Sequence, residues 1–253
     1  MPTLYLVGTP IGNLEDMTFR AVRVLKEVPL VAAEDTRRAR VLFAHYGIQT
    51  PVTSYHEQGS GAKAGPIIRL LATKDVALIS EAGMPSISDP GFGLVREALA
   101  AGAKVEVVPG PSAVTAAVAA SGLPSDQFLF LGFLPRTRPP RKRAIEAVRN
   151  QPYTLVVLES PHRIVRCLQD LAAGLGDRRV AVCRELTKLH EEVFRGTLSE
   201  AQARFEEPRG EFTLVIERAS ENPEVVTDRI VSERLQALMA DGLSSRDAVT
   251  GMP

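Results

Sequence analysis

The stretch that decides the fold is LYLVGTPIGN, residues 4–13 of a 253-residue chain. An apolar run passes into a glycine-containing loop, and a helix is predicted from about Thr18. Similar β-rich runs followed by helical patterns recur at residues 30–33, 76–79, 104–108, 128–131, 155–158, 180–183 and 213–216. Several of these runs are continuously apolar, which is typical of strands that are covered on both faces. The pattern therefore predicts an α/β fold.

Two breaks near the middle of the chain divide this pattern into halves. Gly110-Pro111 precedes an alanine-rich segment, and a second break follows at residues 122–125. We expect an N-terminal α/β domain over residues 1–112 and a C-terminal α/β domain over residues 113–220. Residues 221–253 are expected to form a helical tail, which is interpreted as incomplete because a further helical pattern has only begun where the sequence stops.

The composition excludes several classes of protein. Hydrophobic residues make up 45% and charged residues 24%, which is ordinary for a globular chain, and 30 basic residues balance 30 acidic ones. Two cysteines cannot supply a disulfide framework or a four-cysteine zinc site, and the four histidines show no metal-ligand spacing, so no metal is expected. Without a basic leader or an apolar run of about 18 residues, we expect a cytoplasmic protein with no membrane association.

Loops rich in small residues follow the strands of the first half. They cover residues 8–13, 80–91 and 109–113. Open α/β sheets bind ligands outside the carboxyl ends of their strands, and glycine allows the backbone to approach a ligand closely. The loops predict a cleft lined mainly by backbone, suited to a small ligand with an aromatic ring and a charged end. Three purely structural turns remain the alternative.

Polar residues in the second half are candidates for proton handling. His162 lies in the segment ESPHR (159–163), while Glu185 and Lys188 lie in RELTK (184–188). A lone histidine at a helix start often hydrogen-bonds locally, and Glu185 with Lys188 could equally form a surface ion pair. The residue types alone do not rank these three.

The stretch PRTRPPRKR, residues 135–143, carries five positive charges and no acid. Its prolines predict an exposed loop outside any helix. Such a patch could contact RNA phosphates, and a solvated charged linker is the alternative. The candidate RNA-binding residues are Arg136, Arg138, Arg141, Lys142 and Arg143.

In their order and spacing, these segments resemble the tetrapyrrole (corrin/porphyrin) methylase family, and within it the methylases of small-subunit rRNA. The resemblance rests on residues 6–14, 33–37, 82–91, 109–112, 121–126, 132–135, 159–163 and 184–188. It implies two α/β domains of the tetrapyrrole methylase type with the cofactor cleft between them, and a homodimer. It also implies S-adenosylmethionine as methyl donor and a cytidine ribose in the decoding region of 16S rRNA, free or in the small ribosomal subunit, as acceptor.

Carried over by position, the resemblance also implies the cofactor contacts. They fall on Ile11, Ala82, Gly83, Met84, Ile87, Ser112, Ala113, Glu159, Ser160, Leu186, Phe212 and Thr213. Methyl transfer from a sulfonium to a ribose 2′-hydroxyl requires alignment above all. Alignment of the reacting atoms can lower the activation barrier by roughly 7–11 kcal/mol, whereas a general base typically raises the reaction rate about 10²–10⁴-fold.

Two other functions remain open from the sequence. A tetrapyrrole C-methyltransferase would use the same cofactor and the same glycine loops, although the basic stretch does not suit its substrate. A non-catalytic RNA- or ribosome-binding factor would keep the cleft without turnover.

Overall fold

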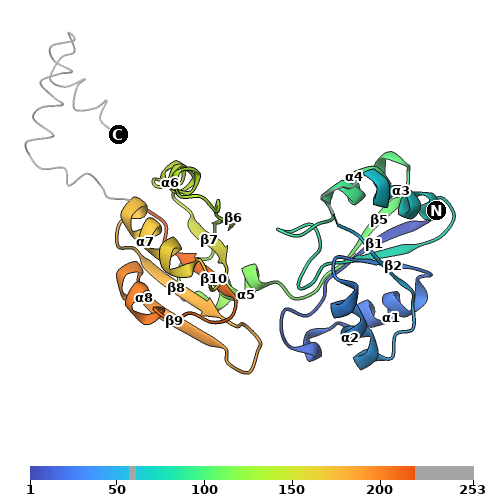
Figure 1. The fold of residues 1–253 in the computed structure, drawn as a ribbon, viewed down its shortest axis with the longest axis horizontal. Helices are drawn as coiled ribbons and strands as arrows, with labels where there is room; N and C mark the ends of the chain where they lie inside the picture. The colour runs from blue at the N-terminus through green and yellow to red at the C-terminus, as the bar shows by residue number, and fades with distance from the viewer. Residues whose placement is uncertain (57–60, 220–253) are drawn as a thin grey trace, which may run out of the picture.

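The computed structural model describes residues 1–56 and 61–219, which form two lobes with a five-stranded sheet in each (Figure 1). The sheet of the first lobe has the order β3-β2-β4-β1-β5, and all its neighbouring strands are parallel. Its strands are β1 (Thr3–Val7), β2 (Val31–Ala33), β3 (Val52–Ser54), β4 (Val76–Ile79) and β5 (Lys104–Val108).

Helices cover both faces of this sheet, which explains why its strands are continuously apolar. One core contains Val7 together with side chains of α1 and α2, and the other contains Leu4 together with side chains of α3 and α4. Successive residues of a strand point to opposite faces, so both faces need apolar residues. The helical segments are η1 (Leu14–Asp16), α1 (Phe19–Glu27), α2 (Thr36–Tyr46), α3 (Gly61–Leu71) and α4 (Phe92–Ala100).

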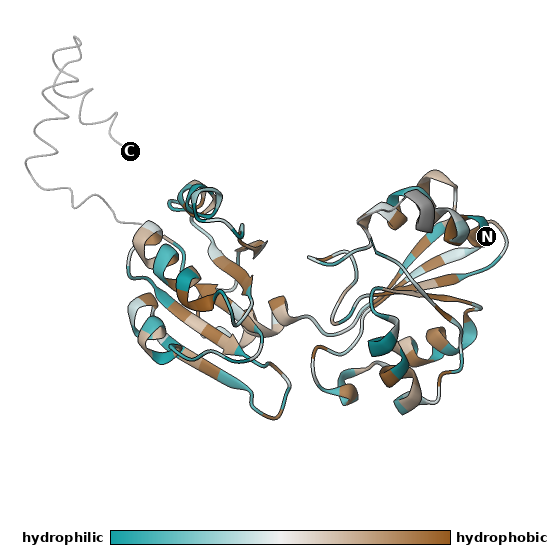
Figure 2. Cartoon of the chain, viewed as in Figure 1, coloured by the Kyte–Doolittle hydropathy of each residue, from teal (hydrophilic) through white to brown (hydrophobic). Residues whose placement is uncertain are grey.

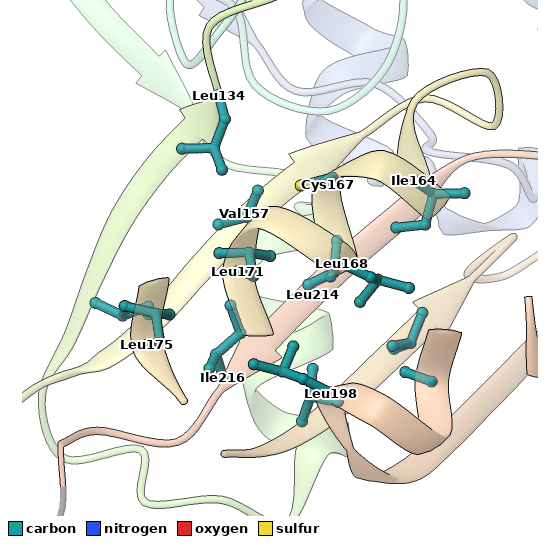
Figure 3. Packing of buried hydrophobic residues seen from close by; sticks show 14 of the residues in the cluster. Leu134, Val157, Ile164, Cys167, Leu168, Leu171, Leu175, Leu198, Leu214 and Ile216 are labelled. Atoms are coloured by element: carbon teal, nitrogen blue, oxygen red, sulfur yellow. The ribbon is translucent and has the colours of Figure 1, made fainter. Parts of the chain in front are cut away.

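The second lobe has a mixed sheet in the order β6-β7-β10-β8-β9, in which only β6 and β7 are parallel. Figure 3 shows its main core, where Leu168 and Leu171 of α7 pack against Val157 and Leu214 of the sheet. Helix α5 packs on the opposite face. The elements are α5 (Ala113–Ser121), β6 (Phe128–Phe133), α6 (Arg138–Ala147), β7 (Thr154–Glu159), α7 (Ile164–Leu175), β8 (Arg179–Arg184), β9 (Glu192–Thr197), α8 (Leu198–Arg204) and β10 (Phe212–Ile216).

The α/β prediction is confirmed, and each predicted strand lies within one or two residues of an observed one. The sequence did not reveal β3 and β9, which are short or polar edge strands. Figure 2 shows brown, hydrophobic strands inside each lobe and teal residues on the helices around them. No described helix combines the length and the apolar character needed to cross a membrane. The tail expected over residues 221–253 lies outside the described residues.

The structure corrects the prediction for the basic stretch. Residues 138–143 are not a loop, because α6 begins at Arg138. Pro139 and Pro140 occupy its first turn, where a missing backbone N–H costs nothing. Arg141 is buried, and its guanidinium donates to Asp170 Oδ2 at 2.8 and 2.6 Å. The prediction that Arg141 is exposed was therefore wrong.

Candidate functional site

Three loops pack against one another at the carboxyl ends of the strands of the first sheet, as the parallel arrangement of these strands predicts. Thr9 and Gly83 exchange backbone hydrogen bonds of 2.9 and 3.0 Å, which join the loops after β1 and β4. A Cβ on Gly8 would lie 2.7 Å from Gly110 Cα, so the loop after β5 packs directly against the loop after β1. Only glycine permits this approach. The result is a platform of closely packed backbone.

A cavity of about 430 Å³ lies over this platform and is closed on its other side by the second lobe. This volume falls in the range of small-molecule sites. Every residue carried over as a cofactor contact lines it, from Ile11 and the 82–87 segment to Thr213. The other lining residues were not among the predicted contacts, although Glu81, Ser88 and Asp89 belong to the predicted cleft loop 80–91. They are Arg38, Glu81, Ser88, Asp89, Val114, Phe133, Leu158, Pro161, Cys183 and Glu211.

Carboxylates line the first-lobe side of the cavity. Burial raises the pKa of Asp89 to about 6, a hydrogen bond from Ser80 opposes this rise, and the charge of Glu81 adds to it. Glu34 does not line the cavity, but its pKa is also raised, by burial and then by Asp89 and Glu81. Arg38 forms an ion pair with Glu81 at 3.1 Å. A bound cation would relieve the repulsion among these carboxylates.

The second-lobe side of the cavity combines apolar side chains with the buried carboxylate of Glu159. Glu159 is buried, and its Oε1 accepts the backbone N–H of Ser160 at 2.9 Å while Oε2 lies 3.1 Å from the Arg163 guanidinium. Phe212 is buried beside it, and burial raises the pKa of Cys183 to about 11, so this thiol is neutral at physiological pH. The wall offers an apolar surface for an aromatic ring.

The three candidates for proton handling do not lie on the lining that the described residues form. Lys188 Nζ lies 2.9 Å from both Glu185 Oε1 and Glu211 Oε2. Burial acts to lower the pKa of Lys188, but the bonds to Glu211 and Glu185 raise it above its usual value. His162 is exposed. This geometry favours a role for Glu185 and Lys188 in shaping their loop over a role in proton transfer.

That loop ties the two lobes together. Glu185 and Thr187 have positive φ angles of 52° and 66°, which are costly for residues with a side chain. Thr187 Oγ1 accepts the backbone N–H of Asn13 at 3.1 Å. A Cβ on Gly12 would lie 2.5 Å from Lys188 Cγ, so the contact is tight. The tie lies directly beside Ile11 and Leu186, one cavity residue from each lobe.

Replacing Thr187 by valine should weaken binding in the cavity about fivefold, because one hydrogen bond contributes about 1 kcal/mol. The Thr187→Ser variant keeps the hydroxyl and should bind as the original chain does. Calorimetric titration of S-adenosylmethionine measures both. Equal affinities for the valine and serine variants would show that the tie does not shape the cavity.

Comparisons with known proteins find similar sequences over most of the chain. The sequence pattern of the Tetrapyrrole (Corrin/Porphyrin) Methylases matches residues 3–202. A relative from Halalkalibacterium halodurans is 46% identical over 98% of this chain and 88% of its own length. One from Thermotoga maritima is 49% identical over 85% of this chain and 98% of its own length. Both are named "Ribosomal RNA small subunit methyltransferase I".

Solved structures share the fold at lower identity. The uroporphyrin-III-C-methyltransferase of Thermus thermophilus has a TM-score of 0.63 and 21% identity, over 87% of this chain and 96% of that protein. A diphthine synthase has a TM-score of 0.67 and 17% identity, over 86% and 90%. At these identities the likeness establishes the two-lobed architecture. It does not identify the molecule that accepts the methyl group.

Proposed function

This chain belongs to the tetrapyrrole methylase family, and from that membership we propose that it methylates 16S rRNA. The donor is S-adenosylmethionine, and the acceptor is the 2′-hydroxyl of a cytidine ribose in the decoding region. The observation that carries the proposal is the single cavity in which both lobes bring together every carried-over cofactor contact. Relatives named as small-subunit rRNA methyltransferases, at 46% and 49% identity, support the choice of acceptor.

The residues of the cavity fit the donor chemically. S-adenosylmethionine carries a sulfonium, an ammonium, a carboxylate and an adenine ring. Asp89 and Glu81 offer negative charge to the cationic groups, and Leu186 and Phe212 offer apolar surface to the ring. Ser112 is the N-cap of α5 and makes no side-chain capping bond, which leaves N–H groups at that helix start for a carboxylate.

The chain contributes mainly alignment to the reaction. When bound, the sulfonium supplies an electrophilic methyl group. The backbone platform at Gly8 and Gly110 fixes the floor of the cavity, and the tie between Asn13 and Thr187 holds the second lobe over it. Alignment of this kind can lower a barrier by roughly 7–11 kcal/mol. His162, Glu185 and Lys188 are the candidates for receiving the hydroxyl proton, and Glu185 and Lys188 are the weaker two because their ion pair holds them off the cavity lining.

Mass spectrometry of small-subunit rRNA tests the proposal. Subunits from a strain that lacks the ribose methylation should gain one methyl group on one cytidine ribose when incubated with the protein and the donor. Binding of the donor without any rRNA labelling would instead favour a tetrapyrrole C-methyltransferase or a non-catalytic binding factor. A panel of tetrapyrroles and rRNA in the same assay separates those outcomes.

The RNA surface is proposed to lie on the second lobe beside the cavity. Arg136, Lys142 and Arg143 are exposed, whereas Arg138 shares Asp170 with the buried Arg141. Arg138 is exposed as well, but its charge is paired, so the other three are the stronger candidates for binding phosphates. They lie on α6 and just before its start, and the ion pairs to Asp170 fix the first turn of α6 against α7.

The Lys142→Gln/Arg143→Gln double variant should bind small subunits more weakly and reduce the slope of log affinity against log salt by about 2, one for each phosphate that is no longer neutralised. Its affinity for the donor should not change. A matched control is Lys26→Gln/Lys74→Gln, which removes two exposed lysines at the amino edge of the first sheet. An equal loss in both variants would indicate a general charge effect.

We further propose that the domains divide at residues 112 and 113, that the protein is a homodimer, and that it acts in the cytoplasm. The packing of α5 on the second sheet supports this boundary. Light scattering of the purified protein tests the oligomeric state.

A further inference from the structure

Strand β6 contains a β-bulge just before Phe133, a residue that lines the cavity. Its pairing with β7 shifts register between Phe130 and Gly132, and Gly132 has a φ of +61°. A β-bulge of this kind re-aims the side chains that follow it, and bulges are frequent beside active sites. The residue that follows is Phe133, whose side chain lines the cavity. The bulge therefore decides where Phe133 points.

Phe133 is 53% exposed, although it ends a strand whose lobe buries most of its large apolar residues. Ile87, from the loop before α4 of the other lobe, is 52% exposed and lines the same cavity. The two segments touch, because a Cβ on Gly132 would lie 2.9 Å from Ser88 Oγ. In Figure 1 the loop before α4 reaches from the first lobe towards β6. Together, Ile87 and Phe133 form an apolar shelf at the rim of the cavity.

The shelf is more accessible than the apolar residues deeper in the cavity. Phe212 is 2% exposed, and Leu158 is partly buried. The deeper residues suit the adenine of the donor, which must be enclosed. The backbone strain of the shelf loop, with positive φ angles of 71° at Ser86 and 60° at Ser88, indicates that its shape is held at some cost.

We propose that Phe133 of this shelf is the subsite for the base of the target nucleotide, while Ile87 keeps the cofactor contact carried over to it. The inference rests on the proposed function and names how its acceptor is held. A pyrimidine base that is splayed out of the RNA stacks on the ring of Phe133. This stacking places the ribose of the same nucleotide at the cavity. Arg136 follows only three residues later, and Arg143 lies on α6, so phosphates on either side of the nucleotide meet positive charge.

Stacking on an aromatic side chain is worth about 1–3 kcal/mol per base, which corresponds to a factor of about 5–150 in affinity. The Phe133→Ala variant should therefore raise the KM for small subunits about fivefold or more, with the affinity for the donor within twofold of the original. Phe133→Tyr keeps the ring and should retain a normal KM. Phe133→Leu keeps apolar volume without the ring and should resemble the alanine variant.

The control is Phe19→Ala, which removes a 98%-exposed phenylalanine on α1 that does not line the cavity. Steady-state methylation of subunits that lack the modification gives KM and kcat, and calorimetry gives the affinity for the donor. An unchanged KM in Phe133→Ala overturns the inference, and a weakened donor affinity assigns the shelf to the cofactor instead.

A different result is expected if the proposed function itself is wrong. In that case the original chain itself transfers no methyl group to rRNA, whatever residue stands at position 133. Should Phe133→Ala fail to fold, the comparison of Phe133→Leu with Phe133→Tyr decides the question. Equal KM values for the leucine and tyrosine variants would then exclude stacking.

Discussion

The Asp89→Asn variant should bind S-adenosylmethionine about 10- to 100-fold more weakly than the original chain at pH 7.5. A hydrogen bond to a charged group is worth about 1.5–3 kcal/mol, and Asp89 is the half-buried carboxylate of the cavity. Calorimetric titration measures the change. Glu27→Gln is the control, because Glu27 is an exposed acid on α1 paired only with Arg23 among the described residues.

The pH dependence of this affinity provides a second readout. Burial raises the pKa of Asp89 to about 6 in the free protein, so the ionised form that favours a cation is lost as the pH falls below 6. Donor affinity of the original chain should therefore drop between pH 7 and 5, and that of Asp89→Asn should drop less. Parallel curves for the two proteins would show that another group binds the cation.

The same shift has the opposite consequence for stability. Because the pKa of Asp89 is higher in the folded than in the unfolded chain, the folded state binds more protons between about pH 4 and 6. Stability from this group therefore falls as the pH rises through that range. The unligated Asp89→Asn variant should melt at or above the temperature of the original chain at pH 7.5, although it binds the donor poorly.

The Arg141→Met variant should lose about 3–5 kcal/mol of folding free energy, because it leaves Asp170 as a buried charge without its main partner. The side chains of Arg141 and Asp170 are only 7% and 3% exposed. Denaturant unfolding followed by circular dichroism measures the loss. Replacing both residues by apolar ones, as in Arg141→Met/Asp170→Leu, should recover much of it, and no recovery would contradict this account of the pair.

The contribution of the Arg141–Asp170 pair to stability should also depend on pH. Burial alone would raise the pKa of Asp170, but hydrogen bonds from Arg141 and Arg138 lower it below its usual value. Its contribution is therefore present at neutral pH and is lost as the pH falls through that lowered pKa, below about 4. A loss of stability that begins near pH 6 in the original chain would have to come from other groups.

The sequence predicted the parts of the site that consist of local backbone. Strand runs and small-residue loops are written in consecutive residues, so the platform at Gly8, Gly83 and Gly110 could be expected before the fold was known. The parallel order of β4, β1 and β5 then places those loops at one edge. The residues that the resemblance proposes as cofactor contacts line the cavity beside these loops, and further ones come from the second lobe.

Side-chain roles depended on contacts between segments far apart in the chain. In the sequence Arg141 is one of five equivalent cations. The structure shows that Asp170, 29 residues away in the chain, lies beside it and is buried with it. For Glu185 and Lys188 the sequence leaves proton handling and an ion pair equally open, and only the structure shows that Glu211 shares the ammonium of Lys188 with Glu185. Composition and spacing determine which elements form and where loops gather. Only tertiary packing decides which charges are desolvated and paired, because burial and electrostatic interaction depend on distance in space.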